Sequence, residues 1–210
     1  MVQNTSHAVM AQRVEGKDSL DDFPTPPWAT RALLAHAIPS YYATKAHSCL
    51  EPAANRGYMS KVLSEFFGYV QSSDVHDYGN GGTVRDFLKD PYRDKSFDWV
   101  ITNPPFRLAE DFVLQSLKVA RVGVAMLVRT MFVESSGRYA NLFTPYPPYR
   151  VAQFVERVPM VKGRLDKKAS TATGYCWMIW LHEHTDPTEL FWIPPTRKSL
   201  ERDADYSFLL

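Results

Sequence analysis

Hydrophobic and polar positions along the chain predict strands that alternate with helices. Four short segments are typical of strands: residues 48–52, 69–74, 97–102 and 122–128. Three other segments, one before the first strand and two between strands, carry apolar side chains three and four positions apart, which predicts helices: residues 28–37, 57–67 and 108–120. This alternation predicts an α/β fold with a mostly parallel, doubly wound sheet.

The C-terminal part of the chain has a different pattern. Residues 151–157 and 174–181 are strand-like, and no helical pattern separates them. They predict an antiparallel hairpin that closes one edge of the sheet. Residues 1–20 are polar and are expected to lack fixed structure, and residues 21–210 are expected to form one domain. A mostly parallel sheet binds its ligand beyond the carboxyl ends of its strands.

Composition and charge exclude several classes of protein. The net charge of the 210 residues is +1, so a nucleic-acid surface would have to be a local patch. Two cysteines far apart in sequence predict neither a disulfide framework nor a zinc site. No apolar run reaches the length of a membrane span, so a cytoplasmic protein without membrane partners is expected. His182 and His184 follow a strand and are expected to be exposed rather than to bind a metal.

The strongest chemical signal is Asn103-Pro104-Pro105-Phe106, directly after the apolar strand at 97–102. The Asn103 side-chain oxygen and the Pro104 carbonyl are two acceptors that could orient the two N–H groups of a weakly nucleophilic amine. The prolines fix the backbone, and Phe106 offers a flat face for a flipped or single-stranded base. The alternative is a plain proline turn that ends a strand.

With this motif the chain resembles the N6-adenine-specific amino-methyltransferases, most closely the short phage- or prophage-encoded ones. The resemblance covers residues 22–181. It implies a Rossmann-like class I methyltransferase fold with a seven-stranded sheet and helices on both faces. It also implies S-adenosyl-L-methionine as cofactor, S-adenosyl-L-homocysteine as product, and an adenine of nucleic acid as target. DNA is favoured over RNA by this resemblance alone.

The resemblance also implies a set of cofactor-binding residues: Thr25, Pro26, Glu51, Pro52, Ala53, Gly57, Asp74, Val75, Asp86, Phe87 and Asn103. Glu51 would bind the ammonium group of the cofactor, Asp74 its ribose hydroxyls, and Asp86 its adenine amine beside Phe87. Each acid taken alone could equally cap a turn or a helix.

One residue departs from the family pattern. Asn55 stands where the first glycine of the cofactor loop is usual, and Arg56 beside it is also unusual. Asn tolerates the left-handed conformation better than other non-glycine residues, so the loop is expected to keep its shape. A chain that binds cofactor or nucleic acid without catalysis is therefore one alternative.

Six basic residues are candidates for phosphate contacts: Arg129, Arg138, Lys162, Arg164, Lys167 and Lys168. The other interpretation of the dense basic region at 158–169 is a solvated loop. Two further enzyme classes remain open, an RNA adenine methyltransferase and a protein glutamine methyltransferase. The latter favours Tyr after the two prolines, whereas this chain has Phe106.

Overall fold

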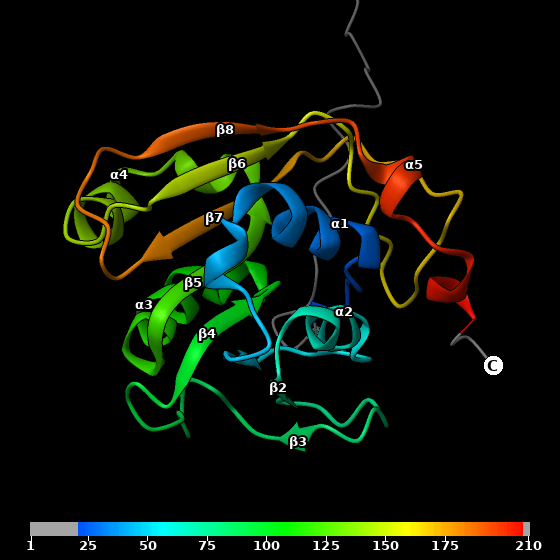
Figure 1. Cartoon of the computed structure of the whole chain (residues 1–210), viewed down its shortest axis with the longest axis horizontal. Helices are drawn as coiled ribbons and strands as arrows, with labels where there is room; N and C mark the ends of the chain where they lie inside the picture. The colour runs from blue at the N-terminus through cyan, green and yellow to red at the C-terminus, as the bar shows by residue number, and fades with distance from the viewer. Residues whose placement is uncertain (1–20, 208–210) are drawn as a thin grey trace, which may run out of the picture.

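The computed structural model describes residues 21–207, and within them the strands form a single sheet (Figure 1). Its strands are β1 (Ser48–Glu51), β2 (Tyr69–Asp74), β3 (Thr83–Val84), β4 (Phe97–Thr102), β5 (Ala120–Arg129), β6 (Arg150–Phe154), β7 (Tyr175–Leu181) and β8 (Glu189–Ile193). Their order is β3-β2-β1-β4-β5-β7-β6-β8. Residues 1–20, for which we expected no fixed structure, lie outside the described residues.

The strand directions confirm the predicted doubly wound sheet and its antiparallel C-terminal hairpin. Neighbouring strands from β3 to β5 are parallel, whereas β7 runs antiparallel to both β5 and β6. The expected number of seven strands is wrong, because the described residues form eight. The additional edge strand, β8, pairs parallel with β6. It packs only one of its faces, and Trp192 on the other face is 59% exposed.

Helices cover both faces of the sheet (Figure 1). The longer ones are α1 (Pro27–Ala32), α2 (Tyr58–Phe66) and α3 (Ala109–Val119), and the π-helices η1 (Leu33–Ala37) and η5 (Tyr139–Phe143). The elements of three or four residues are α4 (Ser136–Arg138), α5 (Arg197–Leu200) and the 3-10 segments η2 (Ser40–Tyr42), η3 (Phe106–Leu108), η4 (Thr130–Val133) and η6 (Asp203–Tyr206). No helix in residues 21–207 is long and apolar enough to cross a membrane.

The predicted helix at 28–37 is regular only in its first half. Beyond Ala32 it continues with wider π turns, and the N–H of Ile38 bonds to the carbonyl of Leu33, five residues earlier. The side chain of Arg150 donates a hydrogen bond to the carbonyl of Ala37 at 2.6 Å. Pro39 then ends the helix because it has no N–H to donate.

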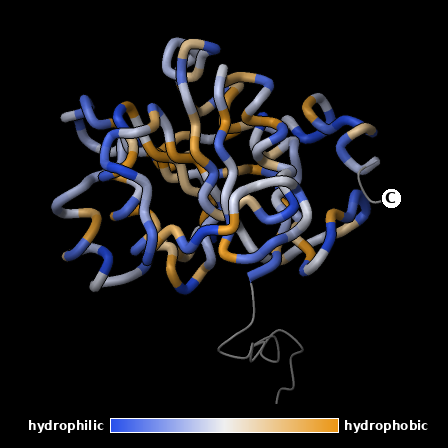
Figure 2. Tube along the Cα trace, turned by 90° about the horizontal axis from the view of Figure 1, so that it is seen from below, coloured by the Kyte–Doolittle hydropathy of each residue, from blue (hydrophilic) through white to orange (hydrophobic). Residues whose placement is uncertain are grey.

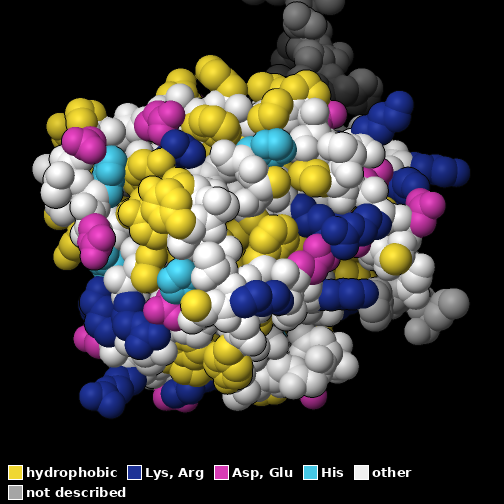
Figure 3. Space-filling model, viewed as in Figure 1, with side chains coloured by type: hydrophobic (Ala, Val, Ile, Leu, Met, Phe, Trp, Pro, Cys, Tyr) yellow, Lys and Arg dark blue, Asp and Glu magenta, His cyan; other side chains and the backbone are white. Residues whose placement is uncertain are grey.

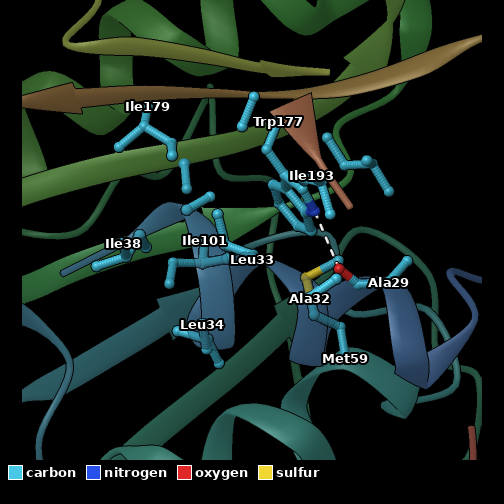
Figure 4. Close-up of a cluster of buried hydrophobic side chains, with 14 of the residues drawn as sticks. Ala29, Ala32, Leu33, Leu34, Ile38, Met59, Ile101, Trp177, Ile179 and Ile193 are labelled. Atoms are coloured by element: carbon cyan, nitrogen blue, oxygen red, sulfur yellow. Dashed lines mark hydrogen bonds between the residues drawn. The ribbon is translucent and has the colours of Figure 1, made fainter. Parts of the chain in front are cut away.

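Two hydrophobic cores follow from the alternation of side chains along the strands. In β4, Trp99 and Ile101 face the core under α1 and α2, and Val100 faces the core under α3. Figure 2 shows hydrophobic segments concentrated in the central strands. Figure 4 shows the first core, in which Trp177 of β7 donates its indole N–H to the carbonyl of Ala29 at 3.0 Å. This bond ties the first helix, and the segment just before it, to the middle of the sheet.

An ion-pair cluster holds the other side of α1. Arg31 is buried and bonds to Asp205 at 2.8 Å and to Glu65 of α2 at 2.7 Å. The three groups join the first helix, the second helix and the C-terminal segment. Because α1 is fixed in this way, residues 21–25 reach the carboxyl ends of β1, β2 and β4.

Candidate active site

A cavity opens at the carboxyl ends of β1, β2 and β4, under the segment formed by residues 21–25. The predicted cofactor residues that line it are Thr25, Glu51, Pro52, Ala53, Asp74, Val75, Asp86, Phe87 and Asn103, joined by Pro105 of the proline motif. Pro26, Gly57 and Pro104 were also predicted as site residues but do not line this cavity. The topology therefore brings together residues that are up to 80 positions apart in sequence (Thr25 and Pro105: 105 − 25 = 80).

Several lining residues were not predicted as site residues. They are Asp21, Phe23, Pro24, Ala54, Asn55, Tyr58, Met59, Tyr78, Arg85, Leu88, Leu108 and Phe112. Tyr58 and Met59 belong to the first turn of α2, directly after the cofactor loop. Their proximity to Gly57 was the available signal, since a helix that begins in such a loop turns its first residues toward the ligand.

Glu51 is a buried acid at the carboxyl end of β1, only 2% exposed. The hydroxyl of Ser60 donates a hydrogen bond to its Oε2. Burial raises the pKa of Glu51 well above its ordinary value, and the neighbouring Asp74 adds to that rise, although the Ser60 hydrogen bonds oppose it. A cation bound nearby would stabilise the charged form of this buried carboxyl group, whose pKa is raised in its absence.

Asp74 ends β2 and accepts hydrogen bonds from two backbone N–H groups. Its Oδ2 accepts from Asn55 at 2.9 Å and its Oδ1 from His76 at 3.0 Å. Burial nevertheless raises the pKa of Asp74. Asp74 thus shapes the loop as a turn-capping residue does, and it also lines the cavity. Each carboxylate oxygen retains a second lone pair for a ligand hydroxyl.

Asn55 adopts the left-handed conformation, with φ 50°, as predicted. Its Nδ2 donates to Asp22 Oδ1 at 2.8 Å, and its Oδ1 accepts the backbone N–H of Arg56 at 2.8 Å. The guanidinium group of Arg56 forms an ion pair with Asp22 at 2.5 Å. Burial would raise the pKa of Asp22, but the hydrogen bonds from Arg56 and Asn55 hold it below its ordinary value.

We call the set of Asp22, Asn55 and Arg56 the clasp. It closes the segment at 21–25 over the cofactor loop, so the two unusual loop residues have a structural role. Sequence reasoning missed the clasp because its partners are more than 30 positions apart. The signal was an acid, Asp22, three positions before the predicted cofactor residue Thr25.

Asp86 and Phe87 lie on the opposite wall of the cavity. Asp86 Oδ1 accepts the N–H groups of Leu88 and Lys89 at 3.1 and 3.2 Å, and its other oxygen pairs with the Lys89 side chain. Burial would raise the pKa of Asp86, but the Lys89 interactions keep it lowered. Phe87 is buried and packs against Phe112. Asp86 is therefore both a turn cap and an available acceptor at the cavity wall.

Asn103 follows β4 and has one satisfied and one unsatisfied side-chain atom. Its Nδ2 donates to the carbonyl of Phe23 at 3.1 Å. Its Oδ1 is buried and has no hydrogen-bond partner in the described part of the chain. Because the Nδ2 is held by a carbonyl, the amide cannot turn over, and the lone acceptor stays where a ligand N–H can meet it.

Phe106 begins η3 and lies in a groove beside the cavity. Its backbone N–H donates to Asp21 Oδ2 at 2.8 Å. The groove is lined by aromatic, basic, hydroxyl and apolar residues and by one acid: Asp21, Phe23, Phe106, Arg107, Arg129, Met160, Val161, Lys162, Ser170, Thr171, Ala172, Thr173 and Tyr175. Asp21 and Phe23 line both the cavity and the groove.

The six basic candidates separate into two groups. Arg129 and Lys162 line the groove. Arg138 bonds instead to the carbonyl of Phe132, while Arg164 and Lys167 pair with Asp166 and Asp203. Lys168 is exposed and does not line the groove. Figure 3 shows Lys and Arg side chains in two regions of this face, one on the side of α5 and one at the lower left, both next to acidic ones.

The site combines an acidic cavity with a groove that contains basic groups. Glu51, Asp74 and Asp86 line the cavity, whereas Arg107, Arg129 and Lys162 line only the groove. Among residues 21–207 no group of three or more His, Cys, Asp or Glu side chains is placed to hold a metal ion. The geometry suits a cationic ligand next to an anionic one, with Asn103 between them.

The sheet order and the reversed β7 define a Rossmann-like fold, and solved structures described as methyltransferases share this fold. No protein-family model matches the chain, and no curated protein sequence matches it either. The fold is nevertheless similar to many solved structures.

Among these solved structures are two described as methyltransferases and one described as a modification subunit. One is a modification subunit of a proposed type I restriction enzyme from Vibrio vulnificus, with a TM-score of 0.58 and 13% identity over 88% of this chain and 51% of that one. The second is a candidate RNA methyltransferase from Pyrococcus horikoshii, with a TM-score of 0.58 and 16% identity over 83% of this chain and 96% of that one. The third, a candidate class I S-adenosylmethionine-dependent methyltransferase from Listeria monocytogenes, has a TM-score of 0.55 and 14% identity over 80% of this chain and 64% of that one.

The chain therefore spans about half the length of the Vibrio protein and nearly all of the Pyrococcus one. These identities are low, so the similarity concerns the fold.

Proposed function

We propose that this protein transfers a methyl group from S-adenosyl-L-methionine to the N6 amine of adenine in nucleic acid, with DNA favoured over RNA. The observation that carries the proposal is the buried Oδ1 of Asn103, an acceptor with no partner among the described residues. An unsatisfied buried acceptor costs stability, so its retention at a cavity wall is best explained by a ligand donor.

The cavity has the chemistry that this cofactor needs. The cofactor carries an ammonium and a sulfonium charge, and four acidic residues, Asp21, Glu51, Asp74 and Asp86, line the cavity together with one basic residue, Arg85. Glu51 would hold the ammonium group, Asp74 the ribose hydroxyls, and Asp86 the adenine amine beside Phe87. When bound, the cofactor supplies an electrophilic methyl group.

The chain's own residues would prepare the target. An exocyclic amine is a weak nucleophile because its lone pair is delocalised into the ring. Asn103 Oδ1 would accept one of its N–H groups and favour the pyramidal form as positive charge develops. In the overall reaction the amine gains a methyl group and gives up one proton to water, and the cofactor becomes S-adenosyl-L-homocysteine.

The groove supports nucleic acid as the class of target. Phe106 and Tyr175 offer faces for stacking a flat ring, and Arg107, Arg129 and Lys162 supply positive charge beside it. A glutamine amide of a protein would use the same acceptor but has no ring to stack on Phe106. The structures described as a modification subunit and an RNA methyltransferase agree with a nucleic-acid target.

The test is a tritiated-methyl transfer assay with duplex DNA, single-stranded DNA, RNA and protein, followed by nucleoside analysis. We expect N6-methyladenine in nucleic acid and no label in protein. Label in protein glutamine would replace the proposal with the protein enzyme. No label anywhere, although calorimetry detects cofactor binding, would instead favour a chain that binds without catalysis.

A further inference from the structure

Arg129 covers the ring of Phe106. Its guanidinium carbon lies 3.9 Å from the centroid of the ring. The two residues stand at the carboxyl ends of β4 and β5, which are parallel neighbours in the sheet. The other aromatic neighbours, Phe23 and Tyr175, are tilted against Phe106 by 40° and 36°, with centroids 5.5 and 6.5 Å away. Arg129 is thus the group that lies at stacking distance.

A guanidinium group is planar and delocalised, so it occupies the space that a stacked base would occupy. A target ring that stacks on this face of Phe106 must therefore displace Arg129. This inference rests on the proposed function, because it takes Phe106 as the surface that receives the target.

The displaced side chain has a place to go. Arg129 is exposed at the end of β5, and no salt bridge joins it to an acidic side chain of residues 21–207. Leaving Phe106 therefore breaks no ion pair among these residues, but it gives up the interaction of Arg129 with the side chain of Tyr175. The groove around it holds Arg107, Lys162 and the hydroxyls of Ser170 and Thr171, which suit a phosphate.

We propose that Arg129 keeps the stacking face of Phe106 covered until a phosphate of the substrate draws its guanidinium group into the groove. Arg129 then has two roles. It blocks the stacking of a ring that carries no phosphate, and it contacts the phosphate of a ring that carries one. This makes Arg129 a specificity-determining residue that selects nucleotides over free nucleosides and other flat amines.

The experiment measures binding rather than turnover. S-adenosyl-L-homocysteine is added to fill the cofactor cavity, and calorimetry then compares 2′-deoxyadenosine with 2′-deoxyadenosine 5′-monophosphate. We expect the wild type to prefer the monophosphate. In Arg129→Ala the nucleoside should bind more tightly and the monophosphate more weakly, so that the preference falls by roughly tenfold.

Two further variants separate the barrier from the phosphate contact. Arg129→Lys keeps the charge but has no flat group, so it should gain affinity for the nucleoside and keep much of the preference for the monophosphate. Arg121→Ala removes an arginine from the other end of the same strand and should change neither affinity. Thermal unfolding checks that each variant is folded.

Nucleoside affinity that does not rise in either Arg129 variant would overturn the inference. If N6-methyladenine forms while the Arg129 affinities are unchanged, only the role of Arg129 fails. If no substrate is methylated but the affinities change as expected, the proposed function fails and the role of Arg129 at a ring-binding site stands.

Discussion

The side-chain amide of Asn55 donates a hydrogen bond to the carboxylate of Asp22, 2.8 Å away and 33 positions earlier in the chain. Together with the Arg56 ion pair, this bond fastens residues 21–25 across the mouth of the cavity. Asn55, which stands where a glycine is usual in the cofactor loop, is therefore part of the contact that holds residues 21–25 over the cavity. We therefore expect the cofactor affinity to depend on Asp22, a side chain outside the loop.

Asp22→Ala should weaken the binding of S-adenosyl-L-homocysteine. The ion pair is partly exposed, so we expect a loss of about 1 kcal/mol, or about fivefold in the dissociation constant. Calorimetry measures this value. Asp166→Ala, which removes an acid that pairs with Arg164 elsewhere on the surface, is the control and should leave the affinity unchanged. Equal affinity in Asp22→Ala and the wild type would show that the clasp does not close on the ligand.

The φ of 50° at Asn55 can be tested by two substitutions. Asn55→Gly and Asn55→Val both remove the hydrogen bond to Asp22, but only Val is strained in the left-handed region. The Val variant should be less stable than the Gly variant by about 1–2 kcal/mol, a difference of about 2–8 °C in Tm. Differential scanning calorimetry makes the comparison. If both variants melt together, the loop must have changed its backbone conformation.

Glu51→Gln should change the pH dependence of both stability and binding. An unfolded chain loses the Glu51 proton near pH ~4.3, whereas burial raises the pKa in the folded protein. Between these two values the folded state holds more protons than the unfolded state, so the free energy of unfolding falls as pH rises. Gln cannot ionise, so urea unfolding of the variant should show a smaller fall across this window.

The same substitution should weaken cofactor binding because it removes the negative charge for the ammonium group. The wild-type affinity should rise with pH as Glu51 ionises, and the variant should show no such rise. Glu183→Gln, at an exposed loop, is the control and should behave like the wild type. A variant that keeps the wild-type pH dependence would assign the effect to another acid.

Asn103→Ala should abolish methyl transfer and spare cofactor binding. Loss of one preorganised acceptor typically lowers kcat by about 10²–10³-fold. Single-turnover transfer and calorimetry with S-adenosyl-L-homocysteine measure the two effects separately. Asn141→Ala, in the exposed part of η5, is the control and should retain full activity. Loss of cofactor binding together with activity would show that Asn103 mainly supports the cavity.

Local patterns were enough to predict most of the sheet. The runs that became β1, β4 and β5 are largely buried and parallel, so their sequence signal was strong, whereas β2 is parallel but mostly half-buried. Strand β3 has two exposed residues and β8 is a half-exposed edge, so neither carries a clear period. The regular helix predicted over 28–37 fails midway because its wide turns depend on tertiary contacts such as the Arg150 bond to Ala37.

The candidate site was predictable where its residues stand at the end of a recognisable strand. Glu51 is the last residue of β1 and Asn103 directly follows β4, and parallel topology brings such strand ends together. The clasp and the position of Arg129 over Phe106 depend on how separate segments pack, and no local pattern encodes them. Basic residues in the 158–169 region were predicted by density alone, and only Lys162 of that group reaches the groove.

Asp21 and Phe23 form a wall shared by the acidic cavity and the basic groove. Two ligands that both shift this wall are thermodynamically linked. If binding of the first changes the affinity for the second by some factor, binding of the second changes the affinity for the first by the same factor. Because the clasp holds that wall, we expect Asp22 to influence the strength of this linkage, although it would touch neither the reacting nitrogen nor the methyl group.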